Sequence, residues 1–372
     1  MKILTGIDVP FQPFGGSLLC CNDWYSDLPN DVEVRFLTLH PPEGQVKWWD
    51  IKDIVMLDII KRRGADEFPR YTAELAEVVR EEIDKYRPDV LHCQHLNYGL
   101  SRVFAEASIG IPKIGICHGT DVQLATSHPF FLENLKIICD AMDVLVFPNQ
   151  NMADDCLAVY GKKKEYVINP LGVPDRFYTP QTHPIRFKGA GQLRVLYAGR
   201  LLTWKGAHIA VQAMKHITRD IHLTVIGNED EAGYVNNMQA FVEAHRLKHL
   251  VTFKPQLTRE KLLKSFDQFD VIVFPSIALE AFSLTVVEAQ LKGLPVVFGK
   301  AGGIVNTVGD SGVPLSEVTP NALAKALDSI YDHPEMLRDT QKRGFTNAAK
   351  YRLSKSQNNL LTISKRLLHP GD

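Results

Sequence analysis

Two glutamates, Glu280 and Glu288, lie eight positions apart in a segment that could bind a phosphorylated sugar. The apolar run Val271–Phe274 just before them predicts a buried parallel strand, and the pattern from Ser283 to Leu291 predicts a helix. Glu280 would then lie in the loop after a strand, which is where ligands bind in open α/β sheets. Glu288 would lie on the first turns of the helix, where its carboxylate can accept hydrogen bonds from a pair of hydroxyl groups.

The predicted start of this helix could bind a diphosphate. The backbone N–H groups of Phe282, Ser283, Leu284 and Thr285 would point out of the helix N-terminus and be available to an anion. With the two glutamates, the segment offers what a nucleotide-sugar site needs. The plainer alternative is a pair of glutamates favoured by the helix dipole.

The segment resembles the E-x7-E motif of retaining GT-B glycosyltransferases of the family-4, or group 1, type. Residues 199–206 likewise resemble the family's GRL…KG segment, here Gly-Arg-Leu-Leu-Thr-Trp-Lys-Gly. The resemblance implies that Arg200 and Lys205 bind the donor diphosphate and offset the leaving-group charge, the first as a planar fork and the second as a point charge. It implies further that Glu280 holds sugar hydroxyls and Glu288 the ribose. Ser283 departs from the glycine of many relatives and could narrow the donor pocket.

A glycine pair follows the first predicted strand, in Phe14-Gly15-Gly16-Ser17. Glycines there let backbone amides approach a phosphate or a sugar closely. The segment resembles the glycine-rich first loop of the same transferases, which implies that Gly15 and Gly16 contact the donor. A tight strand–helix turn is the alternative. The dinucleotide fingerprint G-x-G-x-x-G is absent from the sequence.

Histidines end two further predicted strands. Cys117-His118-Gly119-Thr120-Asp121 resembles the family's HG segment, whose histidine contacts the transferred sugar near its reacting carbon. Asp121 could orient the acceptor, or could cap the following helix. Asp89-Val-Leu-His92-Cys-Gln-His95 resembles the family's strand end that lines the acceptor cleft. The two histidines could also form a metal pair, but no third ligand is apparent, so we expect them to line the cleft, with His95 binding the acceptor.

Strand-like runs alternate with helix-like segments along the whole chain, which predicts parallel sheets with right-handed crossovers. Two such blocks predict two doubly wound domains, joined at the proline-rich stretch 172–184. We expect an acceptor-binding domain of residues 1–174 and a nucleotide-sugar-binding domain of residues 175–351. The resemblance implies that the helix within 352–372 packs back onto the first domain. It also implies the GT-B fold, with two Rossmann-like domains facing across a cleft.

Composition limits the partners and the compartment. The net charge of −1 gives no general case for nucleic acid, although the first 170 residues carry −8 and the rest +7, which suits an anionic ligand in the second half. The six cysteines form no C-x-x-C pair and are expected to be reduced core thiols. Without a long apolar run or a signal-like start, we expect a cytoplasmic protein with at most peripheral membrane contact. In residues 47–57 the aromatics are expected to pack in an acceptor loop rather than on a membrane surface.

These expectations combine into one function. The sequence has no Asp-x-Asp pair of the kind that holds a metal-bound diphosphate. We therefore expect metal independence, and the resemblance implies a retaining hexosyltransferase without a bound cofactor. A UDP-sugar is favoured as co-substrate, and a hydroxyl of a small or glycan acceptor receives the sugar, as in antibiotic or glycoconjugate biosynthesis. The alternatives are a non-catalytic sugar-nucleotide-binding protein of the same fold and a nucleotide-sugar epimerase.

Overall fold

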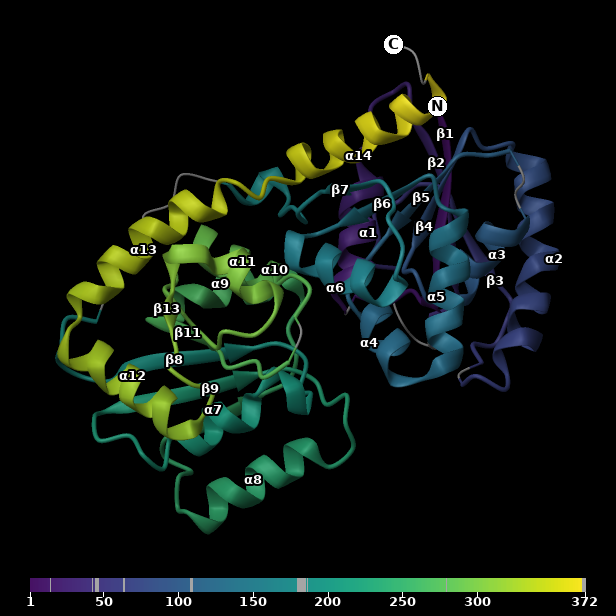
Figure 1. Cartoon of the computed structure of the whole chain (residues 1–372). Coiled ribbons are helices and arrows are strands. Elements are labelled where there is room, and N and C mark those ends of the chain that lie inside the picture. The colour runs from purple at the N-terminus through teal and green to yellow at the C-terminus, as the bar shows by residue number, and fades with distance from the viewer. Residues whose placement is uncertain are drawn as a thin grey trace. The chain divides into compact units, whose positions relative to one another are not determined.

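The computed structural model describes residues 1–13, 15–41, 43, 47–62, 64–107, 110–178, 185, 187–278 and 280–369. The chain divides into two compact units, Met1–Gly172 with Leu353–Asp372, and Val173–Arg352 (Figure 1). The predicted boundaries at 174 and 351 fall within two residues of these limits. Phe14 and most of the predicted connection, residues 179–184, lie outside the described residues.

A parallel sheet of seven strands forms the centre of the first unit, in the order β3-β2-β1-β4-β5-β6-β7. Its strands are β1 (Lys2–Pro10), β2 (Glu33–Leu39), β3 (Ile54–Leu57), β4 (Val90–Gln94), β5 (Lys113–Ile116), β6 (Val144–Phe147) and β7 (Tyr166–Ile168). Its helices are α1 (Gly16–Ser26), α2 (Phe68–Tyr86), α3 (Gly99–Ala107), α4 (Thr120–Ser127), α5 (Pro129–Ala141), α6 (Gln150–Tyr160) and α14 (Leu353–Leu368). Every residue of β4, β5 and β6 is buried, as expected for central strands covered on both faces.

A six-stranded parallel sheet forms the centre of the second unit, in the order β10-β9-β8-β11-β12-β13. Its strands are β8 (Leu193–Ala198), β9 (Ile221–Ile226), β10 (Val251–Lys254), β11 (Val271–Phe274), β12 (Val296–Phe298) and β13 (Val313–Pro314). Its α-helices are α7 (Ala207–Ala213), α8 (Tyr234–Ala244), α9 (Arg259–Ser265), α10 (Leu284–Leu291), α11 (Gly303–Val308), α12 (Pro320–Asp332) and α13 (Glu335–Ala348). Short 3₁₀ turns are η1 (Asp175–Phe177), η2 (Thr203–Lys205), η3 (Phe266–Gln268) and η4 (Gly309–Ser311).

Each sheet reverses its winding direction once, and this reversal decides where a ligand can bind. In the first unit the chain builds outward from β1 to β3 and then starts again at β4 on the other side of β1. In the second unit the same reversal separates β8 from β11. The loops after such strand pairs diverge and leave a crevice, which is the usual ligand site of open α/β sheets. The predicted residues Gly15, His95, Arg200, Lys205 and Glu280 follow these strands, whereas His118 and Asp121 follow the neighbouring strand β5.

Helix α14 belongs to the first unit because one of its faces is apolar. Leu360, Leu361 and Ile363 are buried in the core beside Ile3 and Trp24. Their spacing, together with buried Ser356 and Ser364, follows the repeat expected of an amphipathic helix. Helix α14 therefore packs on the core of the first unit.

Two edge strands, β3 and β13, were not predicted from the sequence. β3 lies within residues 47–57, which we expected to be loop, and it pairs with β2 from Phe36 to Leu39. Trp48 and Trp49 just before it pack on Phe11, with ring centroids 5.0 and 5.6 Å apart. The aromatics of this segment therefore cover the core of the first unit.

Candidate functional site

Glu280 lies in the loop after β11, as predicted, and is almost completely buried. Its Oε1 atom forms an ion pair with Nζ of Lys205, which comes from the loop after β8. Its Oε2 atom accepts a hydrogen bond of 3.2 Å from the hydroxyl of Ser276. The carboxylate is thus oriented from both sides, and the cation predicted to bind phosphate lies directly against it.

Glu288 lies inside α10 and is also buried. Its partner is Arg259 at the start of α9, whose Nε forms an ion pair with Oε1 of Glu288. The guanidinium of Arg259 also lies over the ring of Phe177, 5.5 Å from the centroid. Only 8% of the Arg259 side chain and 5% of the Glu288 side chain is open to solvent, so this ion pair is buried. Arg259 was not predicted.

The loop from Gly199 to Gly206 is held against the loop after β11 by backbone contacts. Gly206 has a φ of 77°, and a Cβ there would lie 2.0 Å from the carbonyl oxygen of Pro275, so the two backbones meet with no room for a side chain. The N–H of Ile277 donates to the carbonyl of Trp204 over 2.9 Å. This close fit brings Lys205 to Glu280. The ammonium of Lys205 also lies over the ring of Trp204, 4.6 Å from its centroid.

Arg200 is the more exposed of the two predicted phosphate-binding cations. Its Nη1 lies 3.5 Å from Oδ2 of Asp230, and 41% of its side chain is open to solvent. The N–H of Leu201 donates to the carbonyl of Asn228, so the loops after β8 and β9 run side by side here. A weak, exposed ion pair of this kind leaves the guanidinium able to change partners.

The start of α10 lies one residue after the predicted start at Ser283. The helix begins at Leu284, and Ser283 precedes it in an extended conformation without a capping side-chain bond. The N–H groups of the first turn, including those of Leu284 and Thr285, have no acceptor inside the helix. The ring of Phe282 contacts that of Tyr351, with centroids 5.4 Å apart. The second unit therefore gathers Arg200, Lys205, both glutamates and an uncapped helix end at its winding reversal.

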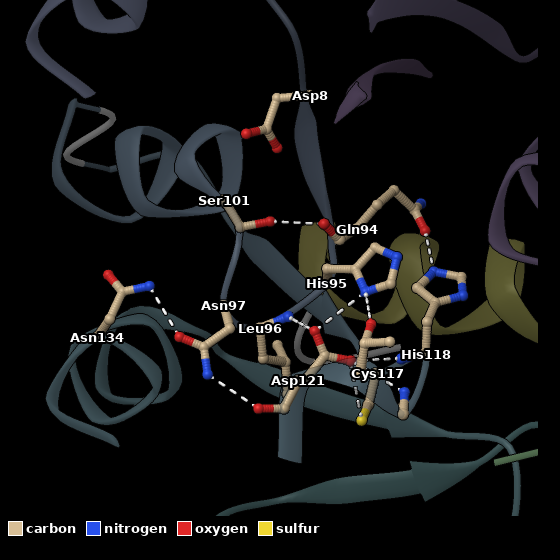
Figure 2. A network of polar contacts seen from close by, with 12 residues as sticks. Asp8, Gln94, His95, Leu96, Asn97, Ser101, Cys117, His118, Asp121 and Asn134 are labelled. Atoms are coloured by element: carbon tan, nitrogen blue, oxygen red, sulfur yellow. Dashed lines mark hydrogen bonds and ion pairs between the residues drawn. The ribbon is translucent and has the colours of Figure 1, made fainter. Parts of the chain in front are cut away.

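In the first unit, His118 follows β5 and is held by two residues (Figure 2). Its Nε2 lies 2.8 Å from Oε1 of Gln94 at the end of β4, and its backbone N–H donates to Oδ2 of Asp121 over 2.7 Å. Burial and the neighbouring His95 lower the pKa of His118 to about 3, although Asp121 acts in the opposite direction. The imidazole is therefore neutral at physiological pH. Gln94 was not predicted.

Asp121 is fully buried and satisfies backbone groups at the ends of two strands (Figure 2). Its Oδ1 accepts from the N–H of Leu96 at 2.6 Å, and its Oδ2 accepts from Gly119 at 3.1 Å as well as from His118. Burial alone would raise the pKa of Asp121, but His95 and these donors hold it below its ordinary value. Asp121 lies inside α4, whose N-cap Gly119 has no capping side-chain bond, so Asp121 instead joins the loop after β4 to the loop after β5. Contact with an acceptor stays a prediction.

His95 is also buried, and it adopts a left-handed conformation with a φ of 68°. Its Nδ1 lies 3.1 Å from Oδ1 of Asp121, and its ring stacks on that of Tyr98 with centroids 4.0 Å apart. Its Nε2 is buried and has no hydrogen-bond partner in the described part of the chain. The polar contacts place His95 beside His118, and acceptor binding by His95 stays a prediction.

The glycine loop lies at the carboxyl end of β1. Gly15 has a φ of 102° and precedes α1, which begins at Gly16. A Cβ at either glycine would meet no atom within 4 Å. Gly15 is thus required by its backbone conformation, and Gly16 leaves open space at the start of a helix. Contact with the donor stays a prediction for both.

His92 differs from the expectation, since it lines no cleft. Its side chain is completely buried, with Nδ1 2.8 Å from the hydroxyl of Tyr25 and Nε2 2.9 Å from that of Ser364 in α14. Burial lowers its pKa to about 3. The sequence could not show this because the whole of β4 is buried, so alternation along the strand does not indicate which face a side chain takes.

Within the described residues, no helix is long and apolar enough to cross a membrane, and no group of three or more His, Cys, Asp or Glu side chains could hold a metal ion. All six cysteines belong to this part of the chain, and each is buried and outside any disulfide.

Comparison with protein families gives two matches that together span most of the chain. Residues 180–346 match the family model described as glycosyl transferases group 1, and residues 27–177 match the model described as glycosyltransferase family 4. A D-inositol 3-phosphate glycosyltransferase of Paenarthrobacter aurescens is 28% identical over 309 residues, which cover 75% of this chain and 74% of that protein. Glycogen synthase of Mycobacterium tuberculosis is 26% identical over 282 residues, or 72% and 65% of the two chains.

Solved structures show the same architecture. Sucrose-phosphate synthase from Thermosynechococcus elongatus matches with a TM-score of 0.84 and 19% identity, over 100% of both chains. Anabaena HepE in complex with UDP and glucose matches with a TM-score of 0.77 and 18% identity, over 98% of this chain and 99% of that one. These likenesses confirm the predicted GT-B fold of two Rossmann-like domains.

Proposed function

Since this chain is a glycosyltransferase of the group 1 type with the GT-B fold, we propose that it transfers a hexosyl-type sugar from a nucleotide-diphosphate sugar to a hydroxyl of a small or glycan acceptor. One observation carries the donor half of the proposal. At the winding reversal of the second unit, two cations, two buried carboxylates and an uncapped helix start come together. This is the set of groups that a sugar diphosphate needs.

Donor binding exchanges partners within this set. In the structure, Lys205 is neutralised by Glu280 and Arg200 by Asp230. A diphosphate carries more negative charge than a carboxylate, so it can draw both cations to itself with help from the amides of α10. Glu280 is then released to accept hydrogen bonds from sugar hydroxyls, while Glu288, held by Arg259, accepts from the ribose.

The chemistry follows from where the charge develops. As the glycosidic bond breaks, negative charge grows on the leaving diphosphate, and Arg200 and Lys205 stabilise it more than they stabilise the intact donor. No metal ion is needed in this scheme because the two side chains and the helix amides supply the positive charge. We propose retention of configuration on the resemblance to the retaining family. In this scheme His118 binds the transferred sugar near its reacting carbon.

UDP is the favoured nucleotide. Anabaena HepE, which shares the fold, has been solved with UDP and with UDP-glucose. A panel of UDP, GDP, ADP, dTDP and CMP in the presence of EDTA tests both which base is preferred and whether binding requires a metal ion. A ligand that binds only the folded state raises the unfolding temperature by mass action. We expect UDP to give the largest rise in wild-type protein.

The decisive comparison is Glu288→Gln against Glu243→Gln. Both remove one paired carboxylate from the second unit, but Glu243 pairs with Lys248 on the surface. The rise with UDP should disappear in the first variant and persist in the second. Turnover of UDP-sugars, with the product's anomeric configuration read by NMR, tests transfer itself. An inverted product, or no nucleotide-dependent rise at all, would overturn the proposal.

A further inference from the structure

One buried amide connects His118 to the interior of the first unit. Gln94 ends β4 and its side chain has no exposed surface. Its Oε1 faces Nε2 of His118 at 2.8 Å, and its Nε2 faces the hydroxyls of Thr5 at 3.2 Å and Tyr25 at 2.8 Å. Figure 2 shows the contact between the amide and the imidazole. These hydrogen bonds belong to a network with two ends, Thr5 and helix α14. The two ends determine which group donates in each hydrogen bond around Gln94.

The first end is Thr5. Its hydroxyl oxygen lies 2.8 Å from the backbone carbonyl oxygen of His92, which has no hydrogen to give. The single hydroxyl hydrogen of Thr5 must therefore point at that carbonyl. Thr5 can then only accept from Gln94, so the NH₂ group of the amide, and not its oxygen, faces Thr5.

The second end is helix α14. The hydroxyl of Ser364 lies 2.9 Å from the carbonyl oxygen of Leu360, so its hydrogen is also used. Nε2 of His92 must then donate to Ser364, which leaves Nδ1 of the neutral ring to accept from the hydroxyl of Tyr25. Tyr25 has no second hydrogen, so it too accepts from Gln94.

Both ends give the same orientation of the amide, and this orientation determines the hydrogen on His118. With its NH₂ turned inward, Gln94 presents only its oxygen to His118, and His118 must donate from Nε2. We propose that Gln94 is a positioning residue that holds His118 as the Nε2–H tautomer, with Nδ1 left as a hydrogen-bond acceptor for substrate. This role rests on the proposed function of His118, but the tautomer itself can be observed without any turnover.

Three elements place titratable or aromatic side chains around His118. Asp121 comes from α4, His95 from the loop after β4, and Trp24 from α1, with its ring centroid 6.3 Å away. Asp121 accepts a hydrogen bond from the backbone N–H of His118. Within the described residues, its carboxylate forms no hydrogen bond with the ring of His118. Gln94 is thus the residue that selects which ring nitrogen carries the hydrogen.

The test is NMR of protein labelled with ¹⁵N-histidine, in which long-range proton–nitrogen correlations distinguish the two neutral tautomers. The signals of His118 are assigned by their loss in His118→Gln. We expect wild-type protein to show protonated Nε2 and unprotonated Nδ1. In Gln94→Met, which keeps the volume but removes the acceptor, the signals should move toward a mixture of tautomers.

Ser101→Ala is the matched control. The hydroxyl of Ser101 donates to the backbone carbonyl of Gln94 over 2.9 Å, so its loss removes a buried hydrogen bond at the same residue without touching the amide (Figure 2). This variant should keep the wild-type tautomer. A protonated Nδ1 in wild-type protein, or an unchanged tautomer in Gln94→Met, would overturn the proposal.

If Gln94→Met does not fold, Gln94→Glu gives the same answer. The introduced carboxylate still accepts from Nε2–H of His118 and adds negative charge, so the pKa of His118 should rise. If the side chain at position 94 did not contact His118, the titration of His118 would be unchanged. In the turnover assay, kcat of Gln94→Met should fall roughly 10- to 100-fold because the ring is no longer oriented. If the tautomer is as expected but no nucleotide sugar is turned over by wild-type protein, the proposed function fails and the assignment of Gln94 stands.

Discussion

At the scale of single residues, the two cations predicted to bind phosphate differ in how much they contribute to stability. Lys205 neutralises a carboxylate that is 5% exposed, while Arg200 pairs at 3.5 Å with Asp230 at the surface of the unit. A buried ion that loses its partner costs far more than an exposed one. The two residues should therefore share a role in catalysis but not in stability.

We predict that Lys205→Ala lowers both stability and activity, whereas Arg200→Ala lowers activity alone. Removing Lys205 leaves Glu280 buried without its cation, which costs about 3 to 5 kcal/mol. Removing Arg200 should cost less than about 1 kcal/mol. Each should reduce kcat by about 100-fold or more if it stabilises the leaving group. Thermal unfolding and steady-state turnover measure the two effects, and equal losses of stability would contradict the assignment.

His92 gives a second prediction at this scale, on pH. Burial lowers its pKa from the ordinary 6.5 to about 3, so between these values the unfolded chain binds a proton that the folded chain does not. The free energy of unfolding should therefore fall as the pH drops below 6.5, by about 1.4 kcal/mol per pH unit from this residue. Denaturant unfolding can be followed by tryptophan fluorescence, since three of the four tryptophans, Trp24, Trp48 and Trp49, lie in the first unit.

The variant His92→Gln should be less stable at pH 7 but should lose less stability on acidification. His40→Gln is the control because His40 is exposed in the same unit, and its slope with pH should match that of wild-type protein. A wild-type slope in His92→Gln would show that other groups, such as His118, account for the acid sensitivity.

At the scale of elements, the site of the second unit depends on two loops that meet backbone to backbone. Gly206, before α7, allows the loop after β8 to approach the carbonyl of Pro275 after β11. Gly233, before α8, has nearly the same φ, 79° against 77°, but a Cβ there would meet nothing within 4 Å. A side chain at Gly233 would cause only the strain of a left-handed conformation. A side chain at Gly206 would cause that strain and also disrupt the close contact between the loops.

We predict that Gly206→Ala lowers kcat/KM strongly, while Gly233→Ala leaves it near the wild-type value. Both variants should lose about 1 kcal/mol of stability from the unfavourable φ, and Gly206→Ala should lose more because the loops are forced apart. Separation of the loops would move Lys205 from Glu280. Kinetics and thermal unfolding of the two variants provide the measurement, and normal activity in Gly206→Ala would show that the close contact is dispensable.

The sequence indicated the central strand β11 but not the edge strands β3 and β13. The apolar run Val271–Phe274 forms β11 as predicted, because a parallel strand buried on both faces needs continuous apolar residues. β3 has only four residues beside charged and aromatic ones, and β13 has two residues, of which one is Pro314. Such edge strands are defined by their neighbours, which a local pattern does not contain.

The candidate site shows the same limit. Residues with a motif, such as Glu280, Lys205 and His118, were predicted. Arg259 and Gln94 were not, since Arg259 meets Glu288 across 29 positions and Gln94 meets His118 across 24. These pairs arise from adjacent strands and from crossover helices, so only the fold brings them together. The residues that orient a site leave little signal in one sequence.

At the scale of the whole molecule, α14 completes a unit whose other residues are all far earlier in the chain. Leu360 is 1% exposed and packs in the core of the first unit. We predict that Leu360→Ala costs about 2 to 5 kcal/mol, whereas Thr362→Ala, on the exposed face of the same helix, changes stability little. The loss should appear in the fluorescence of Trp24, whose indole N–H donates to Ser356 of α14 over 3.0 Å. Equal stability of the two variants would show that the helix is peripheral.

This arrangement also sets an order for synthesis. The ribosome releases residues 1–172 first, yet their hydrophobic core stays open on one side until Leu353–Leu368 has emerged. The intervening stretch, Val173–Arg352, is continuous and has every strand of its sheet before then. The unit whose synthesis begins first therefore completes its hydrophobic core last. While it waits, its uncovered apolar surface is open to chaperones and to aggregation, so the cost of a slow or interrupted translation falls on the amino-terminal half.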